Sequence, residues 1–146
     1  MLEIDADVVD QMVAHARADH PDEACGVVAG PAGSGRPVRF IPMLNAARST
    51  TFYEFSSPDL LALYRELDDN DEEPVVIYHS HTATEAYPSR TDVAYANEPG
   101  AHYVIISTRE CGSEPGPYEL RSFRIVDGAV TEEPVVVLGA ADDPGR

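Results

Sequence analysis

The most informative residues for chemistry are two histidines one residue apart, followed by a serine and an aspartate. His79 and His81 end an apolar run, and Ser89 and Asp92 follow them after seven and two intervening residues. Side chains at positions i and i+2 of a strand point to the same side, so both imidazoles can reach one metal ion. The Asp92 carboxylate could complete a three-ligand set, which is typical of Zn²⁺ sites that keep a fourth position for water.

This ligand set predicts a catalytic zinc site. Two neutral imidazoles and one carboxylate leave a net charge of about +1, so the ion stays a strong Lewis acid that lowers the pKa of bound water to ~7. A lone histidine on an apolar strand is more often a packed or hydrogen-bonded residue. Four defined positions in fixed register argue against that interpretation, because the pattern arises by chance in roughly one chain in a thousand.

The elements around these residues can hold them in place. The run Val75–Tyr78 is the most apolar strand signal in the chain, and it leads directly into the histidines. Residues 82–88 have loop composition. Ser89 or Thr91 can then cap a short helix over residues 92–97, which would carry Asp92.

The rest of the chain alternates helical and β-type patterns. Residues 5–18 place apolar side chains at helical spacing behind a possible Asp5 or Asp7 cap, and a second helix is expected from Ser56 or Ser57 to about Leu67. The remaining expected β stretches are residues 25–29, 36–44 (an edge or irregular path because of its prolines), 50–55, 103–107, 118–126 and 135–138, with a hairpin turn at 127–128. Interleaved helices and strands predict an α/β or α+β sheet with helices packed on it.

Length and charge restrict the class of protein. With 146 residues the chain is one domain, and 26 acidic against 10 basic residues give a net charge of −16. Such a chain is unsuited to nucleic acid or to anionic membranes, and it has no 18-residue apolar run. The acidic N-terminus is unlike a secretory signal, and Cys25 and Cys111 form no CxxC motif. We therefore expect reduced thiols and a cytoplasmic protein.

The pattern HxH-x7-S-x2-D, preceded by Glu23, resembles the signature of the JAMM (MPN+) zinc metallopeptidases. The resemblance covers essentially the whole domain. It implies a JAMM/MPN-like α/β (α+β) domain over residues 1–140, with a mixed central sheet flanked by helices and a flexible tail at 141–146. It also implies one Zn²⁺ per chain and an activity that removes ubiquitin or ubiquitin-like proteins from their conjugates.

The segment HSHTATEAYPSRTD, followed by EPGAHYVIIS, is similar to the compact bacterial branch of the Mec type. That similarity implies a narrower substrate: a small ubiquitin-like sulfur carrier protein whose C-terminal Gly-Gly bears cysteine. Hydrolysis of this amide would release free cysteine and so serve cysteine biosynthesis. An extended tail could add as a strand beside the metal, and its glycines would permit a close approach.

The resemblance also implies individual roles. His79, His81 and Asp92 would bind zinc, and Glu23 would be the general base that takes a proton from the attacking water and passes it to the leaving amine. Ser89 would donate a hydrogen bond to the oxyanion, and it has a rival or concurrent role as a helix N-cap.

Other polar residues are weaker candidates. Asn45 and Arg90 could line the substrate groove, although Arg90 could equally be solvated. Cys25 could be a thiolate or a fourth ligand, but its apolar surroundings favour packing. Ser80 is expected to face away from the metal, and His102 to be a hydrogen-bonded core or rim residue.

Four other classes of protein could carry metal-binding histidines or this type of domain. A related isopeptidase could act on another ubiquitin-like conjugate, and a non-catalytic MPN scaffold could bind partners without metal, although it would lack part of the zinc set that is complete here. A zinc deaminase needs HxE with PCxxC, and a barrel amidohydrolase needs about 250 residues, so motif and length exclude both.

Overall fold

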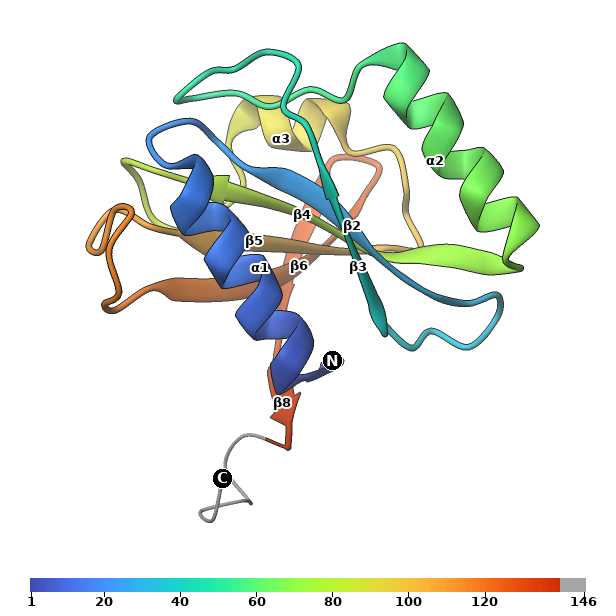
Figure 1. The fold of residues 1–146 in the computed structure, drawn as a ribbon. Helices are drawn as coiled ribbons and strands as arrows, with labels where there is room; N and C mark the ends of the chain where they lie inside the picture. Colours follow the sequence, from blue (N-terminus) through green and yellow to red (C-terminus); the bar gives the residue numbers. More distant parts are fainter. Residues whose placement is uncertain (140–146) are drawn as a thin grey trace.

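The computed structural model describes residues 1–139, and a six-stranded mixed sheet forms their centre (Figure 1). The strand order is β3-β2-β4-β5-β6-β7, in which β4 and β5 pair in parallel and all other neighbours pair antiparallel. The strands are β2 (Cys25–Pro31), β3 (Arg39–Met43), β4 (Glu72–His81), β5 (His102–Ser107), β6 (Glu119–Val126) and β7 (Ala129–Glu133). The single-domain mixed-sheet prediction is confirmed, and β3 is an edge strand as its prolines indicated.

Helices cover both faces of this sheet, as Figure 1 shows with α1 (Ala6–Asp19) lying across one side. The apolar side chains of α1 pack on alternate residues of the central strands, Tyr78 and Val104 among them. The opposite face receives α2 (Ser57–Asp69) and α3 (Arg90–Tyr95). The period-2 alternation of β4 therefore places His79 and His81 on the face covered by α2 and α3.

Both longer helices form where their apolar spacing predicted them. α1 buries Val8, Val9, Met12, Val13 and Ala16, which lie on one face of a 3.6-residue helix. α2 begins after Ser56, whose Oγ accepts a hydrogen bond from the backbone N–H of Asp59 at 3.2 Å. It continues two residues past the expected end at Leu67.

Two expectations for the shorter elements were wrong, and two strands, β1 and β7, were not expected. Residues 50–55 form no strand but a loop that lies over the sheet, because their polar backbone groups bond to Asn45 and Thr82 instead of a strand edge. The turn at 127–128 joins β6 to β7, not to residues 135–138. That last stretch is β8 (Val135–Leu138), which pairs in parallel with the unexpected strand β1 (Leu2–Asp5).

The strand β4 positions the two histidines. Its last seven residues are buried, and it pairs with β2 on one side and β5 on the other. Strand pairing on both sides therefore holds β4 where it leads into the histidines. Among residues 1–139, no helix combines the length and apolar character that a membrane span requires. The expected tail at 141–146 lies outside the described residues.

Candidate metal centre

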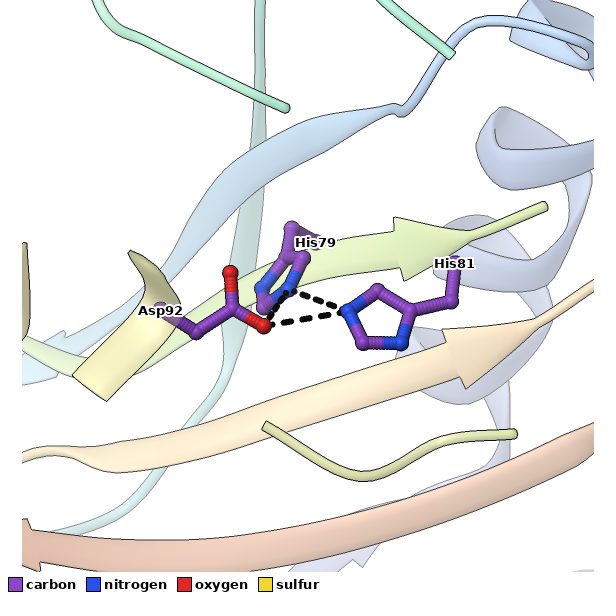
Figure 2. A group of neighbouring side chains, drawn as sticks. All are labelled: His79, His81 and Asp92. Atoms are coloured by element: carbon purple, nitrogen blue, oxygen red, sulfur yellow. Dashed lines mark hydrogen bonds and ion pairs between the residues drawn. The ribbon is translucent and has the colours of Figure 1, made fainter. Parts of the chain in front are cut away.

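Three potential ligand atoms converge where β4 ends and α3 begins (Figure 2). The Nε2 atoms of His79 and His81 lie 3.2 Å apart, and Oδ2 of Asp92 lies 3.1 and 3.0 Å from them. Both histidines are almost fully buried. The HxH spacing on a strand and the Asp92 carboxylate on the following helix thus come together as the sequence suggested.

The two imidazoles are held by different contacts. The Nδ1 atom of His81 lies 2.8 Å from the carbonyl oxygen of Glu85, which makes that nitrogen an N–H donor, so that in the neutral ring Nε2 carries the lone pair that a metal would need. His79 stacks instead on the ring of Tyr53, with centroids 4.5 Å apart and planes inclined by 21°. Its Nδ1 atom is buried and has no hydrogen-bond partner within residues 1–139.

A capping box orients Asp92. The backbone N–H of Ser89 donates to Asp92 Oδ2 at 2.9 Å, and the backbone N–H of Asp92 donates to Ser89 Oγ at 3.1 Å. The helix therefore begins at Arg90, two residues before the expected start. Because Ser89 Oγ accepts a hydrogen bond in this box, its own O–H stays available as a donor beside the ligands. The N-cap and oxyanion roles of Ser89 are compatible.

Burial and hydrogen bonding shift the pKa values of the three ligands in different directions. Burial lowers the pKa of His79. Burial acts in the same direction on His81, but hydrogen bonds to Asp92 and to the Glu85 carbonyl outweigh it and raise the pKa of that residue. The hydrogen bonds from both histidines overcome the burial of Asp92 and hold the pKa of its carboxyl well below the usual range. Asp92 is therefore an anion at neutral pH.

The donor set suits a divalent cation of the zinc type. Two imidazole nitrogens and one carboxylate oxygen present lone pairs to a common point, and a positive charge there would satisfy all three. Glu23 adds a second unmet group, because its Oε1 atom is buried and has no hydrogen-bond partner in the described part of the chain. The residues present therefore fit the metal that the sequence resemblance implied.

Glu23 precedes β2 and is 5% exposed. Burial raises the pKa of Glu23 to about 8, with the charge of His81 opposing the rise and that of Asp92 adding to it. The carboxyl of Glu23 thus shares the electrostatic environment of the ligands although it lies 56 residues from His79 in the sequence. A bound cation would lower this pKa and favour the ionised form.

The structure places the two proposed groove residues differently. Asn45 is buried, and its amide hydrogen-bonds only to other residues of this chain, so it offers no free polar atom to a substrate. Arg90 is exposed beside Ser89 and forms no ion pair with any described residue. The groove expectation stays a prediction for Arg90 alone.

Several residues outside the ligand set behave as expected. Ser80 faces away from the metal ligands, with its Oγ accepting from the backbone N–H of Ala24 at 2.8 Å. His102 is hydrogen-bonded to Glu133 at 2.6 Å. Cys25 is buried, and burial followed by the charges of Asp19 and Glu23 raises the pKa of its thiol to about 12, which disfavours a thiolate. Sequence patterns gave no signal for Tyr53.

A cavity of about 310 Å³ opens from Asp92 between α2 and α3. Its walls are largely aromatic and aliphatic, as is usual in pockets that bind small ligands or side chains. The principal lining residues are Phe52, Tyr53, Phe55, Leu60, Tyr64, Tyr95 and Tyr103.

Comparison with known proteins agrees with this centre and its scaffold. A CysO-cysteine peptidase from Mycobacterium tuberculosis is 67% identical over 138 residues, which cover 94% of this chain and 92% of that protein. The solved structure of a Desulfitobacterium hafniense protein superposes with a TM-score of 0.79 at 29% identity, covering 94% of this chain and 92% of that one.

The fold itself also has solved counterparts. A JAB1/MPN domain protein from Archaeoglobus fulgidus superposes with a TM-score of 0.55 at 17% identity, covering 93% of this chain and 99% of that one. The Prok-JAB family model, described as prokaryotic homologs of the JAB domain, matches residues 5–126. The resemblance drawn from HxH-x7-S-x2-D is confirmed, and the chain belongs to the Prok-JAB family.

Proposed function

We propose that this chain is a zinc-dependent peptidase that hydrolyses the amide bond between the C-terminal glycine of a small ubiquitin-like sulfur carrier and cysteine. The observation that carries the proposal is the convergence of His79, His81 and Asp92 within 3.2 Å of one another. The buried carboxyl of Glu23 is close enough for the charges of His81 and Asp92 to shift its pKa. The 67% identity to a CysO-cysteine peptidase supports the choice of carrier.

His79, His81 and Asp92 would hold one Zn²⁺. When bound there, the ion supplies a Lewis acid that makes water acidic near neutral pH. The imidazoles contribute neutral nitrogen ligands, fixed by the Glu85 carbonyl and by the Tyr53 ring. The Asp92 carboxylate is ionised, so this ligand loses no proton when it binds the cation.

Glu23 and Ser89 would perform the remaining chemistry. Glu23 takes a proton from the attacking water and delivers a proton to the cysteine nitrogen as the C–N bond breaks. The products are a carrier with a C-terminal glycine carboxylate and free cysteine. Ser89 Oγ donates a hydrogen bond to the carbonyl oxygen as it gains negative charge, an interaction typically worth roughly 3 kcal/mol of barrier.

The cavity beside Asp92 would receive the carrier tail. Its apolar walls suit side chains of an extended segment, and a Gly-Gly end would let the scissile carbonyl approach the metal ligands without steric conflict. The two free cysteines of the chain fit a reducing compartment, so we place the reaction in the cytoplasm. Because the proposed reaction releases free cysteine, we assign it to cysteine biosynthesis.

The test uses zinc-loaded protein and a purified carrier–cysteine adduct. Mass spectrometry of the carrier should show loss of one cysteine residue, and a thiol assay should show an equal amount of free cysteine. Glu23→Gln should lower kcat by about 10²- to 10⁴-fold, while the matched variant Glu3→Gln, which alters an exposed carboxylate on β1, should act like the parent. Full hydrolysis by Glu23→Gln would refute the mechanism.

The same assay separates this substrate from a branched conjugate. A carrier joined through its terminal glycine to a lysine side chain should be cut much more slowly than the carrier–cysteine adduct. Faster cleavage of the lysine conjugate would instead identify an isopeptidase, and the absence of stoichiometric zinc would identify a non-catalytic scaffold.

A further inference from the structure

Glu23 lies in a segment that has no regular secondary structure of its own. Residues 20–24 connect α1 to β2, and Oε1 of Glu23 has no hydrogen-bond partner in the described residues. The side chain therefore gains no orientation from a bond at that oxygen. Its placement beside His81 and Asp92 depends on how firmly the surrounding backbone is fixed.

Asn45 anchors this backbone from one side. Its Nδ2 atom donates to the carbonyl oxygens of Glu23 and Phe52, each at 2.9 Å. Its Oδ1 atom accepts from the backbone N–H groups of Ala47 and Glu54 at 3.0 and 3.1 Å. Every hydrogen-bonding position of the buried amide is thus used, and Asn45 joins Glu23 to both ends of the loop that follows it.

The same loop holds the other side of Glu23. The backbone N–H of Glu23 donates to the carbonyl oxygen of Ser49 at 2.8 Å. The loop also carries Tyr53, directly after the Phe52 carbonyl that Asn45 binds, and Tyr53 stacks on the ligand His79. One loop therefore touches both the proposed general base and a metal ligand.

Ser80 supplies a second anchor from β4. Its Oγ atom accepts from the backbone N–H of Ala24 at 2.8 Å, and its own N–H donates to the Ala24 carbonyl at 2.9 Å. Because Ser80 lies between the two histidines and faces the opposite side of the strand, it ties the residue next to Glu23 to the strand that carries the ligands.

We propose that Asn45 and Ser80 are positioning residues, which hold the Glu23–Ala24 backbone so that the Glu23 carboxyl faces the centre formed by His79, His81 and Asp92. The inference rests on the proposed role of Glu23 as the general base. Displacing a reacting group by about 1 Å can cost on the order of 10²-fold in rate, so loss of either anchor should lower kcat although neither residue touches the substrate.

The test compares Asn45→Asp, Asn45→Ala and Ser80→Ala in zinc-loaded protein. Asn45→Asp keeps an oxygen for Ala47 and Glu54 and loses both donated bonds, to Glu23 and Phe52. We expect kcat to fall at least tenfold in all three variants, with KM and zinc affinity within threefold of the parent. Amide hydrogen exchange measured by NMR should quicken at Ala24 in Ser80→Ala and at Glu23 in the Asn45 variants.

Ser122→Ala is the matched control, because it also removes a buried side-chain hydrogen bond, at a site away from the metal ligands. It should keep the parental kcat and the slow exchange of Glu23 and Ala24. If Asn45 variants do not fold, Ser80→Ala decides the question. Parental kcat in a folded Ser80→Ala, or a fall in kcat explained by lost zinc or by an equal fall in Ser122→Ala, would overturn the inference.

Glu23→Gln separates this inference from the proposed function. If Glu23→Gln keeps full activity, the proposed general base is wrong and the inference falls with it. If Glu23→Gln is inactive while the folded anchor variants match the parent, the proposed function stands and only the positioning role is refuted.

Discussion

Two buried glutamates of this chain, Glu23 and Glu133, lie in opposite chemical surroundings. Oε2 of Glu133 accepts a hydrogen bond from Ser122 at 2.8 Å and lies 2.6 Å from Nδ1 of His102. Burial acts to raise the pKa of Glu133, but these bonds outweigh it and lower that pKa. Glu23 is similarly buried, and Oε1 of each glutamate lacks a hydrogen-bond partner among residues 1–139. Oε1 of Glu133, however, forms an ion pair with the amino group of Met1 at 3.1 Å, whereas Glu23 forms no ion pair with a described residue, and its pKa is raised to about 8.

The difference shows what separates a reactive cluster from a structural one. Both clusters pair histidine with a carboxylate inside the same sheet. His102 is the register partner of Val76, so it lies toward the start of β5 and on the other face from His79 and His81. The Glu133 carboxylate is bound by donors and a positive charge from the chain, whereas the ligand centre gathers two imidazole nitrogens and a carboxylate oxygen at one point, an arrangement that suits an added cation.

The largest expected effect is that of the metal on activity. Removal of zinc with a chelator should abolish hydrolysis, and one equivalent of Zn²⁺ should restore it. His81→Ala should lose both zinc and activity, because only two ligands remain. His102→Ala should bind zinc and hydrolyse substrate like the parent, though with lower stability. Elemental analysis measures the bound zinc, and an activity assay measures hydrolysis. Loss of zinc in His102→Ala would contradict the division between a metal-binding cluster at His81 and a structural cluster at His102.

The two glutamates should respond oppositely to neutralisation. Glu23→Gln should lower kcat by about 10²- to 10⁴-fold without reducing stability, because it removes a poorly solvated ionisable group. Glu133→Gln should keep kcat and lose about 1–3 kcal/mol of unfolding free energy, because it weakens bonds to buried partners. Urea denaturation and steady-state kinetics test this pair. A large loss of kcat in Glu133→Gln would contradict the division.

The serines beside the two carboxylate clusters provide a smaller contrast. Ser89→Ala should lower kcat by about 10²- to 10³-fold and cost about 1 kcal/mol of stability, since it removes both an oxyanion donor and a helix cap. Ser122→Ala should cost a similar amount of stability and leave kcat unchanged. Equal kinetics in the two variants would mean that Ser89 acts only as the N-cap.

The pH dependence of stability should differ between the two glutamates in metal-free protein. The raised pKa of Glu23 means that the folded state binds more protons between pH 4.5 and about 8. Its stabilising contribution is therefore full below pH 4.5 and is lost as the pH rises toward 8. The lowered pKa of Glu133 gives the reverse, a contribution present above pH 4.5 and lost on acidification.

Denaturation curves measured across this pH range test whether the unfolding free energy rises or falls with pH as each glutamate predicts. Glu23→Gln should flatten the decline on the alkaline side, and Glu133→Gln should flatten the decline on the acidic side. A steeper alkaline decline in Glu23→Gln would show that the carboxyl is ionised and stabilising in the folded protein.

Much of the candidate site could be predicted because its spacing is short and periodic. The strand rule placed His79 and His81 on one side and Ser80 on the other, and the possible cap at Ser89 or Thr91 placed Asp92 at the start of the next helix. Asn45 and Tyr53 could not be assigned in this way. Their roles depend on a loop that folds over residues distant in sequence, and local propensity carries no information about such contacts.

The fold was predictable where one residue pattern decided the outcome. The spacing of Val8, Met12 and Ala16 fixed α1, whereas residues 50–55 have β propensity but meet no strand edge. The β1–β8 pair joins the two ends of the described chain, so no local sequence pattern predicts that pairing.

The most direct test of the metal assignment is an anomalous difference map at the zinc absorption edge from crystals of the zinc-loaded protein. The account predicts one peak per chain, about 2.0–2.2 Å from Nε2 of His79, Nε2 of His81 and a carboxylate oxygen of Asp92. A map with no peak at these three atoms, or with its peak at His102 and Glu133 instead, would contradict it.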